Sequence, residues 1–478
     1  MRRMAGSPRG GAVLLTGALL ASALTAQAAA AAPTVEVWRT TGDGSVLLAR
    51  QADAEFGTGG GAATVIDVDE TTSYQTIDGF GAAFTDSAAH LVNDELAPAA
   101  RDELMTDLFG ADGIGLSMLR QPLGASDFTH DGDYTYDDTC CDLSDLSVVR
   151  DRDDVLPLVR QAKRINPELK LIGTPWSAPA WMKTNEDLDG GALRPENNGL
   201  LADYLVGTAQ AYADAGLPLD YLSVQNEPYH PETPDGGAGY PSMHMDPAQQ
   251  AAIIGDELGP KLAEAGLGTK ILAWDHNWDH PEYPAQVVDD PEAGRHTAGA
   301  AFHCYGGSVG AQREFHQEHP DKGTWLTECS GGAWSPDFAD NLEWNTRNLI
   351  IGGIRNWAKG VTFWNIALDQ NHGPTNGGCT DCRGVVTVDT ETGQVHRNVE
   401  YYVLGHVAKF VRPGATRIES TSNPEDIETV AFRNPGGGIV LLALNSAGAE
   451  RSFQVRHRGR SFEHTLPAGA VTTFTWQP

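Results

Sequence analysis

The segment Tyr221-Leu222-Ser223-Val224-Gln225-Asn226-Glu227-Pro228 is a short apolar run that ends in polar residues. Runs of this kind alternate with amphipathic stretches between about Thr71 and Val403, which is the pattern of βα units. Helices are expected between the runs, for instance at 151–165, 200–215, 247–265 and 338–358. The expected strands are residues 75–84, 115–122, 169–175, 221–226, 270–275, 299–305, 323–328 and 360–368. Eight strands interleaved with helices indicate an α/β fold of the (β/α)8 TIM barrel type rather than a doubly wound sheet.

Both ends of the chain carry a different pattern, one of short alternating strands. After His406 these are residues 439–445, 451–455 and 471–476, separated by Pro-Gly-Gly-Gly and similar turns, and residues 35–39 and 45–49 alternate in the same way. The two ends are therefore expected to join in one β-sandwich domain fused to the side of the barrel. The predicted boundaries are 1–32 for a signal peptide, 33–69 for the N-terminal strands of the side domain, 70–405 for the catalytic barrel and 406–478 for the C-terminal β-sandwich.

The N-terminus and the overall charge restrict where the protein acts and on what. Arg2, Arg3 and Arg9 precede an apolar run from Ala12 to about Ala26, which is the pattern of a secretory signal peptide. That run is shorter than the roughly 20 residues that cross a bilayer, so a secreted protein without a membrane span is expected. A formal net charge of -31 argues against nucleic acid or anionic lipid as a partner. A neutral ligand is the simplest expectation, and the sequence does not indicate an oligomeric state.

The six cysteines belong to a chain that is expected to pass through an oxidising compartment, where disulfides are allowed. Cys379 and Cys382 have the C-x-x-C spacing, but no second such pair is found, so a local disulfide is favoured over a metal site. The adjacent Cys140 and Cys141 are not expected to pair with each other. Cys304 and Cys329 complete the set, without a predicted partner.

Two glutamates are the first candidates for chemistry. In a (β/α)8 barrel the active site lies at the C-terminal ends of the strands, and Glu227 and Glu328 close the fourth and seventh expected strands. Such a pair can hydrolyse a glycoside, because one protonated carboxyl gives its proton to the leaving oxygen while the other attacks the anomeric carbon. A separation of about 5 to 5.5 Å would retain the anomeric configuration, and a gap wide enough for a water would invert it. A salt bridge to a loop Lys or Arg is the structural alternative for either residue alone.

Tryptophans supply a second signal, because flat apolar faces at strand ends can stack on sugar rings. Core packing is the alternative for any single one. Trp364, in Phe363-Trp364-Asn365 at the end of the last strand, is assigned to the floor of the sugar site. The tryptophans at or just after strand ends are Trp176, Trp181, Trp274, Trp278, Trp334 and Trp364.

Seven stretches in the same order resemble glycoside hydrolase family 30, the glucosylceramidase-like group of (β/α)8 enzymes. They cover most of the barrel, whereas Asn226-Glu227-Pro228 alone would be a weak signal. The stretches are residues 77–86 (Ile-Asp-Gly-Phe-Gly-Ala-Ala-Phe-Thr-Asp), 119–128 (Leu-Arg-Gln-Pro-Leu-Gly-Ala-Ser-Asp-Phe), 175–185 (Pro-Trp-Ser-Ala-Pro-Ala-Trp-Met-Lys-Thr-Asn), 226–228, 303–305 (His-Cys-Tyr), 327–329 (Thr-Glu-Cys) and 364–368 (Trp-Asn-Ile-Ala-Leu).

The resemblance implies a double-displacement mechanism with Glu227 as acid/base and Glu328 as nucleophile, and no metal or other cofactor. Arg120 and Tyr305 would bond the nucleophile, keeping it ionised and aimed. Asn226 would hold the sugar 2-hydroxyl.

The same resemblance implies that Asp127 and Trp176 bind the outer hydroxyls of the glycone. For His303, a structural role and direct contact with the substrate both remain open.

The loop at residues 369–382 departs from the lysosomal glucosylceramidases and looks closer to bacterial and fungal members that cut β-1,6-glucan. The expected substrate is therefore β-1,6-glucan first, glucosylceramide or another β-glucoside second, and xylan third. A non-catalytic glycan-binding protein is the alternative from another class, and the presence of both carboxylates argues against it.

Overall fold

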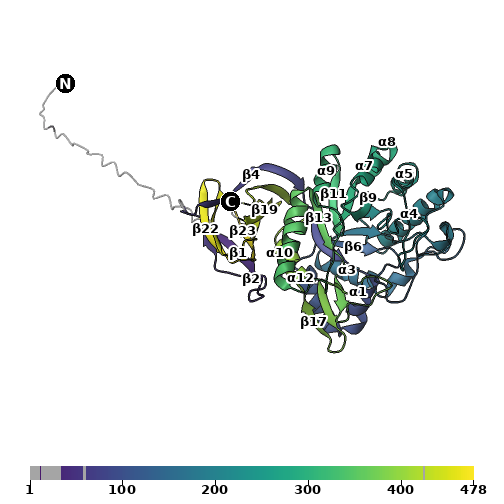
Figure 1. The fold of residues 1–478 in the computed structure, drawn as a ribbon, viewed down its shortest axis with the longest axis horizontal. Helices are drawn as coiled ribbons and strands as arrows, with labels where there is room; N and C mark the ends of the chain where they lie inside the picture. The colour runs from purple at the N-terminus through teal and green to yellow at the C-terminus, as the bar shows by residue number, and fades with distance from the viewer. Residues whose placement is uncertain (1–10, 12–33, 58–60, 424–425) are drawn as a thin grey trace, which may run out of the picture. The chain divides into compact units, whose positions relative to one another are not determined.

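The computed structural model describes residues 11, 34–57, 61–423 and 426–478 (Figure 1). In these ranges eight parallel strands close into a barrel in chain order, with β13 returning to β5. The barrel strands are β5 (Gly79–Ala83), β6 (Met118–Pro122), β7 (Lys170–Thr174), β8 (Tyr221–Ser223), β9 (Lys270–Asn277), β10 (Thr297–His303), β11 (Gly323–Glu328) and β13 (Ala358–Phe363). The predicted (β/α)8 TIM barrel is confirmed. The predicted signal peptide, residues 1–32, lies outside the described residues apart from Gly11.

Helices follow the barrel strands at the expected places. The predicted helices at 151–165 and 200–215 correspond to α3 (Val155–Ile165) and α4 (Asn198–Asp214). The other two are helices with a π-helical middle: α5 (Pro247–Ala252), η5 (Ile253–Leu258) and α6 (Gly259–Glu264), then α10 (Phe338–Trp344), η6 (Asn345–Gly352) and α11 (Gly353–Arg355). The remaining helical segments are α1 (Asp86–His90), η1 (Leu91–Glu95), α2 (Pro98–Phe109), η2 (Val148–Arg152), η3 (Ala180–Met182), η4 (Pro195–Asn197), α7 (Glu282–Asp289), α8 (Pro291–His296), α9 (Gly310–Glu318) and α12 (Val399–Ala408). No helix of the described part is both long and apolar enough to span a bilayer.

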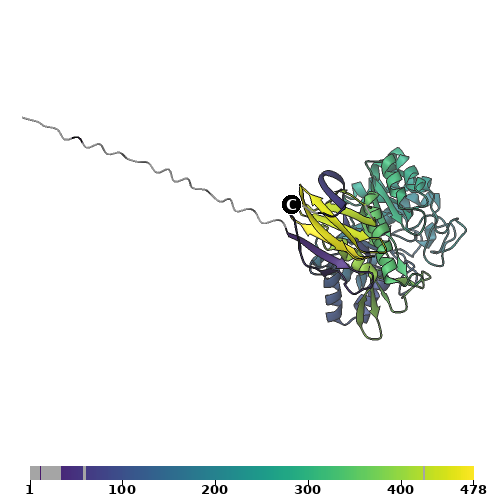
Figure 2. The same cartoon turned by 60° about the vertical axis from the view of Figure 1, so that its left-hand side comes forward.

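Both ends of the chain join in one curled sheet, which confirms the predicted side β-domain (Figures 1 and 2). Within the described ranges its order is β2-β1-β23-β20-β19-β18-β4-β21-β22, and β3 pairs with β1. The long strand β4 makes the curl, since its first half pairs with β21 and its second half with β18. The strands are β1 (Thr34–Thr40), β2 (Ala49–Arg50), β3 (Ala54–Glu55), β4 (Thr64–Thr76), β18 (Thr416–Ser420), β19 (Ile427–Arg433), β20 (Ile439–Asn445), β21 (Arg451–His457), β22 (Arg460–Leu466) and β23 (Val471–Trp476).

The strand expected at 45–49 was wrong, because only Ala49 belongs to β2 and the residues before it form bends. The carboxylate of Asp43 accepts a hydrogen bond from the Ser45 backbone N–H at 3.0 Å and another from the Thr41 hydroxyl at 2.6 Å. Local side-chain bonds of this kind compete with strand pairing, so the alternating pattern does not become a strand here.

Strand β20 explains how the sheet is attached to the barrel. All seven of its residues are buried, and because strand side chains alternate, its two faces serve two cores. Val440, Leu442 and Leu444 belong to the large core of the barrel, whereas Ile439 and Leu441 pack inside the curled sheet. The sheet is thus packed against the barrel by an apolar face.

Short strands connect the loops above the barrel. The expected strand at 360–368 is divided into β13 and β14 (Ala367–Asp369) by Asn365, whose φ is 42°. Strand β14 continues the three-stranded sheet with β16 (Val386–Asp389) and β17 (Gln394–Arg397), while β12 (Gly331–Gly332) pairs with β15 (Cys382–Arg383).

Three disulfides are formed in the described residues. Cys379–Cys382 confirms the predicted local bridge, and Cys304–Cys329 joins the ends of β10 and β11. The prediction that Cys140 and Cys141 do not pair was wrong, because a cis peptide bond brings their Cα atoms to 3.1 Å and the two sulfurs are joined.

Candidate active site

The C-terminal ends of the barrel strands surround a cavity of about 520 Å³. Seven of the predicted site residues line it: Asp127, Trp176, Asn226, Glu227, Tyr305, Glu328 and Trp364. The eighth, Arg120, lies fully buried on β6, below this layer. The cavity wall also contains residues that the sequence had not assigned to a site: His230, Tyr240, His276, Asn277, Gly377, Gly378, Cys379 and Cys382, together with Trp334.

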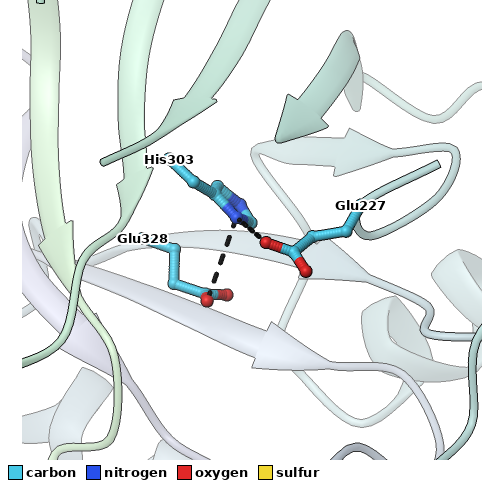
Figure 3. A group of neighbouring side chains, drawn as sticks. All are labelled: Glu227, His303 and Glu328. Atoms are coloured by element: carbon cyan, nitrogen blue, oxygen red, sulfur yellow. Dashed lines mark hydrogen bonds and ion pairs between the residues drawn. The ribbon is translucent and has the colours of Figure 1, made fainter. Parts of the chain in front are cut away.

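Glu227 and Glu328 converge as the strand positions predicted. Glu227 follows β8 and Glu328 ends β11, and an oxygen of each carboxylate and a ring nitrogen of His303 all lie within 4.8 Å of one another (Figure 3). Glu328 is only 6% exposed. The three side chains are close enough together to bind a cation. The buried Arg120 guanidinium already bonds Glu328, however, and so disfavours a second positive charge there.

Glu328 is held by two donors. The Arg120 Nη1 forms a buried ion pair with its Oε2, and the Tyr305 hydroxyl donates to its Oε1 at 2.9 Å. The other end of the guanidinium, Nη2, donates to the Asn226 Oδ1 at 2.6 Å and to the Asp275 Oδ2 at 3.0 Å. One arginine therefore fixes the relative positions of Glu328 and Asn226.

His303 connects the two sides of the site. Its Nδ1 lies 2.9 Å from the Glu227 Oε1, and its Nε2 lies 3.0 Å from the Asp275 Oδ1. Asp275 also accepts bonds from the hydroxyls of Thr327 at 2.6 Å and Thr174 at 3.1 Å. With a carboxylate on each ring nitrogen, His303 has a structural role that bears directly on Glu227.

The charges in this network shift the pKa values strongly. Burial favours the neutral form of Glu227, but the neighbouring His276 and His303 outweigh it and hold its pKa at about 2. Burial lowers the pKa of His303, whereas Glu328, Asp275 and Glu227 raise it to about 9. These opposite shifts favour the imidazole as the carrier of the proton in the Glu227–His303 hydrogen bond, whereas a protonated carboxyl was expected from the sequence.

Glu328 differs from the expectation that its arginine partner keeps its pKa low. Burial raises the pKa of Glu328, and the lowering by His303 and Arg120 does not offset it. The like charges of Glu227 and Asp275 act in the same direction as burial. The expectation considered the ion pair but not the desolvation of the carboxylate.

Asp275 is the main site residue that sequence reasoning missed. It is fully buried, and its pKa is lowered because Arg120 and His303 outweigh the effect of burial. Trp274 and Asp275 have φ values of 74° and 67°, and the pairing of β9 with β10 skips Asp275. This bulge directs Asp275 into the network. The same signal that marked the glutamates was available, because Asp275 is the polar residue that ends the fifth expected strand.

The floor of the cavity is aromatic. Trp176 and Trp364 stack with their ring centroids 5.2 Å apart, and the Arg120 guanidinium lies 4.9 Å from the Trp176 centroid. Asp127 stands in the same wall, and burial raises its pKa well above the usual value, together with the charges of Glu328 and Glu227. The assignment of Trp364 to the cavity floor agrees with this geometry.

Three other tryptophans have a packing role and do not contribute to the cavity. Trp181, Trp274 and Trp278 do not line the cavity, and each donates its indole N–H to a structural acceptor. Trp274 and Trp278 are buried. Trp274 packs on Tyr283 of α7 and Trp278 bonds Gln312 of α9, so these two serve the packing of helices around the barrel.

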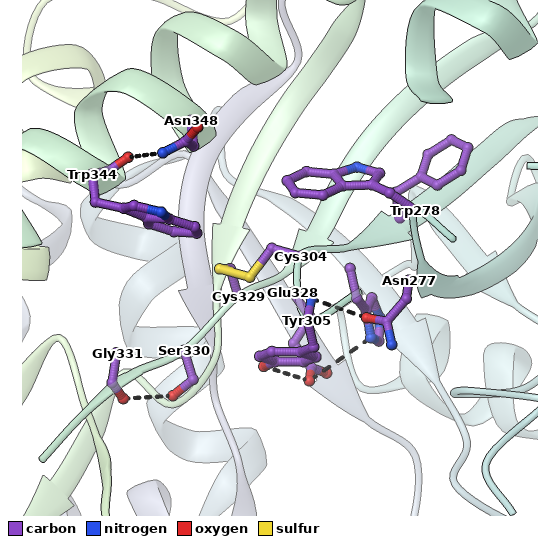
Figure 4. Close-up of a disulfide and its surroundings, with 12 residues drawn as sticks. Asn277, Trp278, Cys304, Tyr305, Glu328, Cys329, Ser330, Gly331, Trp344 and Asn348 are labelled. Carbon is purple, nitrogen blue, oxygen red and sulfur yellow. Dashed lines mark hydrogen bonds and ion pairs between the residues drawn. A yellow bond between two sulfur atoms is a disulfide. The ribbon is translucent and has the colours of Figure 1, made fainter. Parts of the chain in front are cut away.

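The loops around the cavity are cross-linked. The Cys304–Cys329 disulfide immediately follows His303 on one strand and Glu328 on the other, beside Tyr305 (Figure 4). The second connection is β12 with β15, where Arg383 forms an ion pair of 2.7 Å with the buried Glu400. Both connections join the segment after Glu328 to its neighbours.

Comparisons with known proteins match the chain in two adjoining parts. Residues 77–411 match the glycosyl hydrolase family 30 TIM-barrel domain, and residues 414–474 match the family 30 beta sandwich domain. An endo-1,6-beta-D-glucanase, neg1, of Aspergillus fumigatus is 33% identical, over 86% of this chain and 87% of that protein. A putative glucosylceramidase 1 of Caenorhabditis elegans is 31% identical, over 85% of this chain and 82% of that protein. Among solved structures, the endo-beta1,6-glucanase BT3312 is similar with a TM-score of 0.88 and 32% identity, over 93% of this chain and 99% of that one.

Proposed function

Because the chain belongs to glycosyl hydrolase family 30, we propose that it is a retaining hydrolase of β-glucosidic bonds that acts by double displacement. The observation that carries this proposal is the approach of a carboxylate oxygen of Glu227 to one of Glu328, within 4.8 Å. Retaining enzymes have their carboxyl groups about 5 to 5.5 Å apart, whereas inverting enzymes need about 6.5 to 9.5 Å to admit a water.

In the first step Glu328 attacks the anomeric carbon of the sugar. The bond from that carbon to the leaving oxygen breaks, Glu227 gives its proton to this oxygen, and the sugar becomes an ester of Glu328. In the second step Glu227 takes a proton from a water, whose oxygen attacks the same carbon and releases Glu328. Two inversions at one carbon leave the β configuration unchanged.

The donors on Glu328 suit the nucleophile. Arg120 and Tyr305 each bond one of its oxygens, so they oppose the desolvation that raises the pKa of Glu328 and fix the orientation of its carboxylate. Because the Oδ1 of Asn226 accepts from Arg120, its amide NH₂ is the group that can donate to the sugar 2-hydroxyl. Such a bond strengthens as positive charge develops at the neighbouring anomeric carbon.

The proton that Glu227 donates is the one that it shares with His303. Asp275 on the far nitrogen fixes the orientation of the imidazole, and the 2.9 Å hydrogen bond lets the proton move to Glu227 as the leaving oxygen gains charge. His303 is in this view a positioning residue that acts through Glu227.

For the substrate we propose β-1,6-glucan. The names of the similar Aspergillus fumigatus protein and of BT3312 support a β-1,6-linkage, as does the loop at 369–382, whose Gly377, Gly378 and Cys379 line the cavity. Glucosylceramide is the second candidate because a putative glucosylceramidase is nearly as similar. Xylan is the third candidate within the family.

Covalent labelling tests the central chemistry. A 2-deoxy-2-fluoro β-glucoside with a good leaving group slows the second step, so mass spectrometry of the digested protein should find one glucosyl-sized adduct on Glu328. An adduct on another residue, or inverted product in an NMR time course, would contradict the proposal.

A substrate panel tests the linkage. The protein should release reducing sugar from β-1,6-glucan, with Glu328→Gln as the inactive control. Release from glucuronoxylan, with β-1,6-glucan and aryl β-glucosides left intact, would make the glucosyl assignment wrong. Binding of glucan without turnover, unchanged in Glu328→Gln, would instead favour a non-catalytic glycan-binding protein.

Secretion is part of the proposal and rests on the sequence of residues 1–32. The protein recovered from the medium of the producing cells should begin near residue 33. A cell-associated protein that keeps Met1 would contradict it.

A further inference from the structure

We propose that Trp334, in the wall of the cavity, is the platform on which the sugar unit of the leaving group stacks, so that the substrate is a gluco-oligosaccharide or polymer rather than a glucolipid. This inference rests on the proposed function, because it extends the cavity that contains Glu227 and Glu328.

The large exposed aromatic side chains of the described residues all follow two neighbouring barrel strands. Tyr305 is 46% exposed, Trp334 55% and Trp344 46%, and all three belong to segments that follow β10 or β11. Tyr305 and Trp334 line the cavity, whereas Trp344 does not. Since Trp176 and Trp364 form the buried floor and Tyr305 bonds Glu328, the more exposed Trp334 is the aromatic side chain left for the outer part of the cavity, where a leaving group must lie.

The Trp334 ring is exposed but lies against its own backbone, which is held by neighbouring segments. Gly332 makes room for it, because a Cβ at that position would lie 1.9 Å from the indole ring. The backbone below is held by the pairing of β12 with β15 and by the Ala333 N–H, which donates to the Asp381 carbonyl at 2.7 Å. A ring that is already ordered loses little entropy when a ligand stacks on it. Trp334 therefore has the preorganisation of a binding surface.

The polar side chains in the cavity that Trp334 lines favour a sugar over a lipid. They include His230, His276 and Asn277. A ceramide would need a continuous apolar surface, and in the described residues Tyr305 and Trp334 are the exposed large apolar side chains at this cavity. A glucose ring instead offers one apolar face for stacking and a rim of hydroxyls for polar groups.

The test compares two substrates that share the glycone and differ in the leaving group. β-1,6-linked gluco-oligosaccharides place a sugar on the platform, whereas β-glucosyl fluoride has a single atom there. Trp334→Ala should lower kcat/KM for the oligosaccharide at least about tenfold and leave that for the fluoride within about twofold. Trp334→Phe should restore much of the loss, because it returns an aromatic face.

Trp344→Ala is the matched control, because Trp344 is also an exposed tryptophan after β11 but lies outside the cavity. This variant should leave kcat/KM unchanged for both substrates. An unchanged ratio of the two kcat/KM values in Trp334→Ala would overturn the platform, as would a larger loss with glucosylceramide in detergent micelles than with the oligosaccharide. If the unmodified protein turns over neither the oligosaccharide nor the fluoride, the proposed function itself fails.

Discussion

At the level of single residues, the two glutamates should respond differently to the loss of their charge. Glu328→Gln should remove nearly all activity on every substrate, because the amide cannot form the glycosyl ester. Glu227→Gln should reduce turnover of β-1,6-linked disaccharides by about 10² to 10⁴ but spare β-glucosyl fluoride, which needs no proton to leave. Steady-state rates on the two substrates check this, and equal losses in Glu227→Gln would contradict the assignment.

The pairing of His303 with Glu227 predicts a particular pH dependence. The pKa of His303 is raised to about 9, so the shared proton is present below that pH and is lost as pH rises through it. Activity on disaccharides should therefore fall on the alkaline side as this proton leaves. In His303→Gln the shared proton is absent, and the alkaline limb of kcat/KM should move to lower pH by at least one unit.

A pH–rate profile on a β-1,6-linked disaccharide measures this shift. His244→Gln is a suitable control, because that imidazole bonds the Pro231 carbonyl and not a carboxylate. An alkaline limb at the same pH in His303→Gln and the unmodified protein would show that His303 does not hold the proton of Glu227.

The positions of the site residues followed from the sequence where a strand ended in a polar residue. Glu227 and Glu328 were located in this way, and the same rule would have found Asp275. What could not be predicted is how these groups interact: both nitrogens of His303 bond carboxylates, and Arg120 bonds Glu328, Asn226 and Asp275 at once. Such a network depends on a backbone bulge in β9, which no side-chain pattern encodes.

At the level of elements, the Cys304–Cys329 disulfide should support both stability and catalysis. It joins two residues that are 25 positions apart, and a loop of that length corresponds to about 3.5 kcal/mol in the chain-entropy account. It also fixes the relative place of Tyr305 and Glu328, whose bond is 2.9 Å. The double variant Cys304→Ser with Cys329→Ser should thus lose stability, and its kcat should fall on disaccharide and fluoride alike.

Urea unfolding and kcat measured on the folded variant separate these two effects. For the stability measurement alone, the double variant of Cys379 and Cys382 is the control, since its bridge spans only 3 positions and should contribute less to stability. A destabilised Cys304/Cys329 variant with unchanged kcat would leave the disulfide with a purely structural role.

Strand boundaries were predicted best where nearly every residue of the strand is buried. The strand at 323–328 coincides with β11, and residues 439–445 and 471–476 coincide with β20 and β23. Errors arose where local bonds or backbone changes intervene: the Asp43 turn replaces the strand at 45–49, and a positive φ at Asn365 divides the last strand. The π-helical segments inside two long helices also leave no mark in apolar periodicity.

At the level of the whole molecule, the sequence indicated that both chain ends form one β-domain but not how the sheet closes. The curl depends on β4, which pairs with β21 over residues 64–67 and then with β18 from Val68 onward. Helix α12 crosses the predicted boundary at 405–406, and the predicted boundary at 69–70 falls within β4. The barrel and the sheet share a buried core, so we expect them to unfold together.

His406 in α12 lies in that shared core, and its titration predicts how stability changes with pH. Its Nδ1 lies 2.9 Å from the Thr473 hydroxyl on β23, and its Nε2 lies 2.9 Å from the Thr40 hydroxyl on β1. Burial lowers its pKa to about 3. Below pH 6.5 the unfolded chain therefore binds a proton that the folded protein does not, so this residue makes stability fall as pH decreases from 6.5 towards 3. Between pH 6.5 and 5.0 the loss from His406 alone is about 2 kcal/mol.

The His406→Gln variant has an amide that can still bond a hydroxyl but does not titrate. It should be less stable than the unmodified protein at pH 7.5, and it should lose less further stability when the pH is lowered to 5.0. Urea unfolding at both pH values measures the difference, and an equal decrease in the two proteins would mean that other groups carry the acid sensitivity.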